Sequence, residues 1–271
     1  MQHTLGRPFR VAGVGLRGGL PAEVEVRPAP RDTGRVFVVD GVAIPATIDN
    51  VVDTRLATTL GRGAARVSLV EHLCAALYAA GVDNAEILVD GDELPVLDGS
   101  AQLWGAAVAA AGLRPQFAAR RPLVVRAPIE VGTKDAWARF EPADHFALDL
   151  TIAFEHPTIR TQRFVGVGTG AAFFTELAWA RTFGFYRDAE ALRALGMARG
   201  ASLDNTVVYD DTGVMNPSGL RAPDEAVRHK ALDAVGDAAL LGAPIHGRFT
   251  GFRAGHALHL ALLRELGAAA R

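Results

Sequence analysis

The stretch VRHKALDAVGDAALLGA at positions 227–243 predicts a long helix, and it resembles the earlier stretch VEHLCAALYAAGV at positions 70–82. Both stretches place a histidine near the start, small residues and leucines behind it, and a glycine at the exit. Apolar residues at helical spacing followed by glycine are typical of a helix and its end. The two stretches therefore indicate a duplicated unit, in which strands accompany one such helix.

The sequence around these helices alternates like short strands. VFVVDGVAIPA at 36–46 contains an Asp40-Gly41 turn, and PLVVRAPIEV at 122–131 starts a second set of strands. The stretch GLRPQFAARRP at 112–122 is the best linker candidate, because it combines two prolines with a basic cluster. We therefore expect an α+β protein of two domains, residues 1–118 and 119–271. The expected helices are Leu69 to about Ala80, Ala101–Ala111, about Asp224–Leu241 and His256–Leu266.

The composition is that of a normal globular protein. Of 271 residues, 49% are hydrophobic and 21% are charged, which excludes disordered, collagen-like and coiled-coil proteins. The 28 Lys and Arg residues against 30 Asp and Glu give a formal charge of −2. This nearly neutral charge gives no indication of nucleic-acid binding.

Cysteine usage and the hydropathy pattern indicate a cellular compartment. Cys74 is the single cysteine, which excludes an intrachain disulfide and a cysteine-based zinc ribbon. The first ten residues lack the apolar segment of a signal peptide, and no run reaches the roughly 18 apolar residues of a membrane helix. We expect a reduced, cytoplasmic protein without a transmembrane segment. Peripheral contact with a membrane surface stays open.

The long helix carries a stripe of polar residues that has two interpretations. His229, Asp233 and Asp237 recur every four residues, so they span only about 80° of the helix surface. A histidine and an aspartate one turn apart can bind one metal ion together. From spacing alone, however, a solvated face with a weak His–Asp pair is the more common arrangement.

The earlier helix begins with Glu71 and His72, which also have two interpretations. Ser68 and Glu71 fit a capping box, which gives Glu71 a purely local role. Alternatively, His72 binds a metal and Glu71 takes a proton from water beside it. The pattern alone favours the capping box.

Other polar residues are ambiguous on their own. His256 opens the last helix, where it is either a half-buried histidine or an acid–base group. Lys230 is either a solvated lysine or a phosphate contact. Thr182 and Phe183 are either packing residues or neighbours of a substrate, and His156 before Pro157 indicates a turn with an exposed histidine. The sequence contains no phosphate-binding Walker motif and no G-x-S-x-G nucleophile motif.

Several segments considered together resemble one known family. They are SLVEHLCAALYAAGVDNAEILVDG, LPVLDGSA, ARTFGF, VMNPSGLRAPDEAVRHKALDAVGDAALLG and FTGFRAGHALHLALL. The set is similar to the zinc-dependent UDP-3-O-acyl-N-acetylglucosamine deacetylases of lipid A biosynthesis, the LpxC family. The resemblance covers nearly the whole chain and implies two topologically similar α+β domains, with the active site in the cleft between them. The boundary expected near Ala119 agrees with that.

The resemblance also implies residue roles. His72, His229 and Asp233 would hold Zn²⁺, although such a ligand set does not separate Zn²⁺ from Fe²⁺. Glu71 would activate water for attack on an acetamide. His256 would stabilise the oxyanion and protonate the leaving amine, and Asp237 would orient it. Thr182 would help to bind the oxyanion. Lys230 would contact the phosphate region of the substrate, and Phe183 would flank the sugar.

Two positions depart from the family pattern. Arg17 stands where the pattern G-V-G-L-H has histidine on the substrate side, and Leu69 stands where threonine is common. Arg17 therefore leaves a second hypothesis open, a deacetylase of another acylated or nucleotide-linked amino sugar. A third hypothesis is a non-catalytic binder of a lipid or nucleotide sugar, although a binder has no need of both an acid and a base. We expect a monomer that acts on a small nucleotide-sugar lipid.

Overall fold

The chain folds around two sheets that have the same topology. The computed structural model describes residues 1–269. The first sheet has the order β2-β3-β9-β4-β5, and the second has the order β12-β13-β18-β14-β15, with the short β11 attached to β18. In both sheets the central strand, β9 or β18, is parallel to one neighbour and antiparallel to the other. The repeat predicted from the two helical stretches is therefore present in the topology.

The strands alternate buried and exposed residues where one face of the sheet meets the core. In β14, for example, Phe146, Leu148, Leu150 and Ile152 are buried. The strands of the first sheet are β2 (Phe9–Val14), β3 (Pro21–Pro28), β4 (Arg35–Val39), β5 (Val42–Pro45) and β9 (Ala85–Asp90). Those of the second are β11 (Leu123–Val124), β12 (Ile129–Thr133), β13 (Ala136–Glu141), β14 (Phe146–Ala153), β15 (Thr161–Val167) and β18 (Ile245–Phe252).

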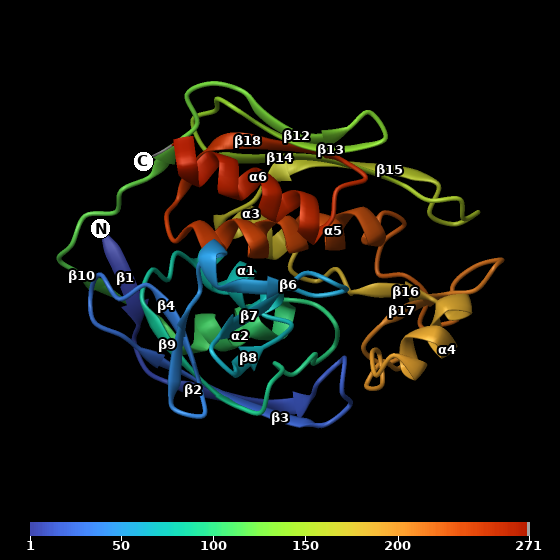
Figure 1. Cartoon of the computed structure of the whole chain (residues 1–271), viewed down its shortest axis with the longest axis horizontal. Helices are drawn as coiled ribbons and strands as arrows, with labels where there is room; N and C mark the ends of the chain where they lie inside the picture. The colour runs from blue at the N-terminus through green and yellow to red at the C-terminus, as the bar shows by residue number, and fades with distance from the viewer. Residues whose placement is uncertain (270–271) are drawn as a thin grey trace.

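The main helices form layers between the two sheets (Figure 1). α1 (Glu71–Ala80) packs against α2 (Gln102–Ala111) and α5 (Glu225–Ala238), and α5 packs against α6 (His256–Ala269). The short α3 (Gly170–Glu176) also contacts α1. Each sheet therefore buries its apolar face against helices, which is the usual solution for an α+β fold.

Smaller elements complete the chain. β1 (Gln2–Leu5) pairs with β10 (Leu113–Gln116), and β6 (Val51–Asp53), β7 (Thr59–Arg62) and β8 (Ala65–Val67) form a small sheet after the 3₁₀ turn Ile48–Asn50. β16 (Phe183–Phe185), α4 (Tyr186–Ala194) and β17 (Val207–Tyr209) project at one side of the molecule (Figure 1). Within residues 1–269, no helix has the length and apolar content needed to span a bilayer.

The chain passes from the first sheet to the second through the expected linker. β10 is the last strand on the side of the first sheet, and β11 already pairs with β18 of the second. We propose, on this basis, that residues 1–118 and 119–271 are the two domains.

The helix expected from Leu69 starts two residues later. Leu69 has a φ of 62°, which is outside the right-handed helical region, so the helix begins at Glu71. Its other end is as predicted, because Gly81 adopts a left-handed conformation with φ of 81° and closes the helix. The Asp40-Gly41 turn is also present, with positive φ at both residues.

Of the two interpretations of the polar stripe on the long helix, the solvated face is wrong. In α5 every residue except Arg228 and Lys230 is buried, so the stripe of His229, Asp233 and Asp237 lies inside the protein. The stripe faces α1, which crosses α5 closely. A Cβ atom added to Gly236 of α5 would lie 2.7 Å from the carbonyl carbon of Glu71 and would overlap its carbonyl oxygen. The close crossing therefore requires glycine at position 236.

We predict that Gly236→Ala lowers the free energy of unfolding by about 1–3 kcal/mol, because α1 and α5 must separate to admit the methyl group. Urea unfolding followed by circular dichroism measures this change.

The matched control is Gly267→Ala in α6, where an added Cβ would meet only ordinary contacts at 3.4 Å and beyond. That control should be neutral or stabilising, since alanine favours a helix. Equal stability of the Gly236→Ala variant and the unchanged protein would contradict the close crossing.

Candidate metal centre and its surroundings

A cavity of about 420 Å³ opens at the α1–α5 crossing. Its walls come from both halves of the chain, namely from α1, α5, the start of α6 and the loops before β7 and β16. The lining residues are Thr54, Leu56, Leu69, Glu71, His72, Thr182, Phe183, His229, Lys230, Asp233, Gly255, His256, Ala257 and Leu258. This lining includes eight of the ten predicted site residues, all except Asp237 and Arg17.

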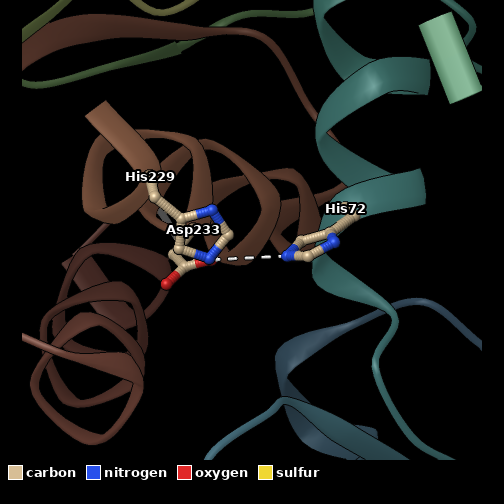
Figure 2. A group of neighbouring side chains, drawn as sticks. All are labelled: His72, His229 and Asp233. Carbon is tan, nitrogen blue, oxygen red and sulfur yellow. Dashed lines mark ion pairs between the residues drawn. The ribbon is translucent and has the colours of Figure 1, made fainter. Parts of the chain in front are cut away.

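Three of these residues converge as candidate metal ligands. His72 comes from the first turn of α1, and His229 and Asp233 lie one turn apart on α5, as Figure 2 shows. Their ligand atoms all lie within 4.8 Å of one another, and all three side chains are buried. The Asp233 Oδ1 atom is 3.3 Å from Nε2 of His229 and 3.8 Å from Nε2 of His72.

The protonation of these side chains suits a metal ion. Burial and the neighbouring His229 lower the pKa of His72 to about 3, so its imidazole is neutral. Burial also lowers the pKa of His229. For Asp233, burial acts in the opposite direction, but His229, Lys230 and His256 hold its pKa well below the usual range. Two neutral imidazoles and one carboxylate are the donor set of many catalytic zinc sites.

The hydrogen bonds of the histidines direct their free nitrogens into the site. The His229 Nδ1 atom donates to the carbonyl of Ala180 at 3.0 Å, which leaves Nε2 available. The Nδ1 atom of His72 is buried and has no partner in the described structure, while Nε2 faces Asp233. The three side chains therefore fit a divalent metal, which both imidazoles would bind through Nε2.

Glu71 lies beside this group and has no capping role. The N-cap of α1 is Val70, without a side-chain cap bond, and the Ser68 hydroxyl bonds to Thr59 instead. The capping-box prediction is thus wrong. The Glu71 Oε2 atom accepts the backbone N–H of Thr58 at 3.1 Å, and burial raises the pKa of its carboxyl to about 8. The other oxygen, Oε1, is 3.9 Å from His256 Nε2.

His256 occupies the opposite wall and is held by Asp237. The His256 Nδ1 atom donates to Asp237 Oδ2 at 2.7 Å. Burial acts to lower the pKa of His256, but Asp237, Asp233 and Glu71 outweigh it and raise that pKa to about 9. Burial likewise opposes ionisation of Asp237, whose pKa is still lowered to about 2, chiefly by His256 and His259. A cationic imidazole thus faces the carboxyl group of Glu71 across the cavity.

Two residues that bind the Asp237 carboxylate were not identified from the sequence. The Thr58 hydroxyl donates to Asp237 Oδ1 at 2.6 Å, and His259 Nδ1 donates to Asp237 Oδ2 at 2.8 Å. The spacing of His256 and His259, three residues apart on one helix face, is a signal that could have identified His259. No sequence signal identifies Thr58, because it reaches the site through a loop.

Lys230, Thr182 and Phe183 lie at the cavity as expected for substrate-facing residues. The Lys230 ammonium donates to Asp233 Oδ2 at 2.9 Å and lies 5.7 Å from the centre of the Phe183 ring. Thr182 is fixed through its backbone, which donates to Gly99 and accepts from Val207. Lys230 is therefore anchored at the site and is not the solvated lysine of the alternative interpretation.

Arg17 is not brought to this cavity. Its side chain is exposed, and it lines a small neighbouring pocket with Arg55, Glu93 and Met197. The two pockets share Leu56 and Leu69, so Arg17 lies adjacent to the cavity and outside it. A substrate contact by Arg17 stays a prediction.

Comparison with known proteins identifies a family. The model of the LpxC family, described as UDP-3-O-acyl N-acetylglycosamine deacetylase, matches residues 2–268. The UDP-3-O-acyl-N-acetylglucosamine deacetylase of Anaeromyxobacter sp. (strain Fw109-5) is 48% identical over 98% of this chain and 88% of its own. The enzymes of the same name from Myxococcus xanthus (strain DK1622) and Phenylobacterium zucineum (strain HLK1) are 46% and 48% identical, each over 98% of this chain and over 86% and 93% of their own.

The matched region includes both helices of the crossing, the three candidate metal ligands, Glu71 and His256. On a match of this length and on relatives of this identity, the chain belongs to the LpxC family of UDP-3-O-acyl-N-acetylglucosamine deacetylases.

Proposed function

We propose that this chain hydrolyses the acetamide of UDP-3-O-((R)-3-hydroxyacyl)-N-acetylglucosamine, releasing acetate and the free amine, as a step of lipid A biosynthesis. One observation carries the proposal. The buried group His72, His229 and Asp233 shares a cavity with an acid–base pair, Glu71 and His256, in a chain that matches the deacetylase family over residues 2–268.

We infer that Zn²⁺ occupies the three-residue group, held by His72 Nε2, His229 Nε2 and a carboxylate oxygen of Asp233. Three protein ligands leave a coordination position open, as catalytic zinc sites require. A divalent cation held there supplies Lewis acidity, which polarises an amide carbonyl and, by its charge, lowers the pKa of nearby water and carboxyl groups.

Glu71 acts as the general base in this proposal. The Thr58 N–H fixes its Oε2 atom, so Oε1 is the oxygen free to take a proton from the attacking water. His256 protonates the departing nitrogen, and the proton held by Glu71 then returns to His256, so both groups end in their starting states. The carboxylate needs no large movement, because it lines the cavity and is held there by the Thr58 N–H.

His256 acts as the general acid. Asp237 holds its Nδ1–H, and the opposite nitrogen, Nε2, faces the cavity 3.9 Å from Glu71. A cationic imidazole there stabilises negative charge as it develops on the carbonyl oxygen, and it can protonate the departing nitrogen. We assign Thr182 a supporting contact to the same oxygen.

Lys230 and Phe183 contact the sugar-phosphate part of the substrate in this proposal. Lys230 also lines a second cavity, of about 700 Å³, together with Arg253 and Phe154. We assign both cavities to the nucleotide-linked substrate, because only its sugar has to reach the metal and the rest of the molecule can occupy the second cavity.

The expectations of a monomer and of a cytoplasmic location belong to the same proposal. The lone buried Cys74 supports the cytoplasmic location.

We predict that the purified protein releases acetate from UDP-3-O-(3-hydroxymyristoyl)-N-acetylglucosamine, and that a chelator abolishes this release. Stoichiometric zinc should restore it. The alternative hypothesis, a different amino sugar, gains support if well-folded, zinc-loaded protein leaves this substrate intact. UDP-N-acetylglucosamine without the acyl chain is the control that shows whether the acyl group is needed.

We predict that Asp233→Ala loses bound metal. The substitution removes one of three ligands and also leaves Lys230 without its carboxylate partner. Metal content after dialysis, measured by atomic emission, should fall from about one ion per chain to near zero. Retention of stoichiometric zinc would exclude Asp233 as a ligand.

We predict that Glu71→Gln keeps its zinc and loses at least about 10²-fold in kcat, the range expected for a general base. Glutamine preserves the shape and can still accept the Thr58 N–H, so the fold should be unaffected. Steady-state acetate release and metal content are measured on the same sample. A near-normal rate would show that Glu71 is not the base.

A further inference from the structure

The Asp237 carboxylate accepts three hydrogen bonds, one from the loop before β7 and two from α6. Its Oδ1 atom accepts the Thr58 hydroxyl at 2.6 Å. Its Oδ2 atom accepts Nδ1–H of His256 at 2.7 Å and Nδ1–H of His259 at 2.8 Å. The carboxylate is fully buried, and among residues 1–269 these three donors are its hydrogen-bond partners, so they orient it.

His259 has no other polar function in the described structure. Its side chain is buried, its Nε2 atom has no hydrogen-bond partner, and the ring packs edge-on against Phe249 at 5.3 Å. Burying an unpaired ring nitrogen is unfavourable, so a residue needed for packing alone would be apolar. The bond to Asp237 is the one feature that requires an imidazole at this position.

The position of His256 depends on that carboxylate. His256 is the first residue of α6 and is buried. Its Nδ1 atom is held by Asp237 Oδ2 at 2.7 Å, so this bond orients the ring. A carboxylate that turned about its Cβ–Cγ bond would carry the His256 ring with it.

We propose that His259 is a positioning residue of the reaction, acting through Asp237: its Nδ1–H bond fixes the carboxylate, and the carboxylate orients His256 toward the cavity. The inference rests on the proposed function and adds a residue to it. His259 is not among the residues that line the cavity. Its contribution is geometric, and it is made through one hydrogen bond.

The test compares two substitutions that differ only in that bond. His259→Leu fills the site without a donor, whereas His259→Asn places an amide N–H near the position of Nδ1. We expect His259→Leu to lower kcat by about 10- to 100-fold with KM changed less than about twofold, and His259→Asn to recover most of the loss. Zinc content should stay at one ion per chain in both.

A control separates positioning from destabilisation of α6. Leu263→Val removes a methylene group from a buried residue of the same helix, whose side chain cannot hydrogen-bond to Asp237. It should lower the thermal midpoint without lowering kcat. Equal losses in His259→Leu and His259→Asn, or a matching loss in Leu263→Val, would overturn the proposal.

A double-mutant cycle and a spectrum complete the test. In an Asp237→Ala background, His259→Leu should cause no further loss of kcat, because its route to His256 is already gone. In the ¹⁵N-resolved imidazole spectrum, His259→Leu should remove one low-field N–H signal and shift that of His256. Additive losses, or an unmoved His256 signal, would overturn the proposal. The spectrum needs no turnover, so failure of the deacetylase assay in the unchanged protein would count against the proposed function alone.

Discussion

The close crossing of α1 and α5 is the constraint on which the site depends. Gly236 lets the backbone of α5 approach the carbonyl of Glu71, and no larger residue fits without displacement. At this distance the side chain of His72 reaches His229 and Asp233, although α1 and α5 belong to different halves of the chain. Neither half contains the complete ligand set, so the assembly of the two halves creates the site.

Because the crossing is buried, its charged side chains need partners. A charge inside a protein is costly unless it is paired and hydrogen-bonded, and each buried carboxylate here has partners. Asp233 has Lys230, Asp237 has three donors, and Glu225 at the start of α5 accepts the guanidinium and backbone N–H of Arg181. The last pair also fixes the segment that delivers Thr182 and Phe183 to the cavity. The same bonds that offset the cost of burial thus set the geometry of the candidate site.

Much of this arrangement could be predicted from sequence, because it depends on local spacing. The four main helices, the glycine that ends α1 and the Asp40-Gly41 turn were all predicted within a few residues. The stripe on α5 was also found, but spacing cannot tell whether α1 covers it. The solvated interpretation was therefore wrong. The turn predicted at His156 is present, but the histidine is buried instead of exposed and donates through Nε2 to the carbonyl of Asp210. Thr58 and His259 were missed because their roles arise from contacts between distant segments, and Arg17 stays an untested departure.

The central claim is that the α1–α5 crossing holds one metal ion. Anomalous diffraction at the zinc edge, from crystals of the zinc-loaded protein, tests it most directly. The account predicts one peak per chain, about 2.0–2.2 Å from Nε2 of His72, Nε2 of His229 and an oxygen of Asp233. A peak held instead by Asp237, His256 and His259, or no peak at stoichiometric zinc, would contradict it.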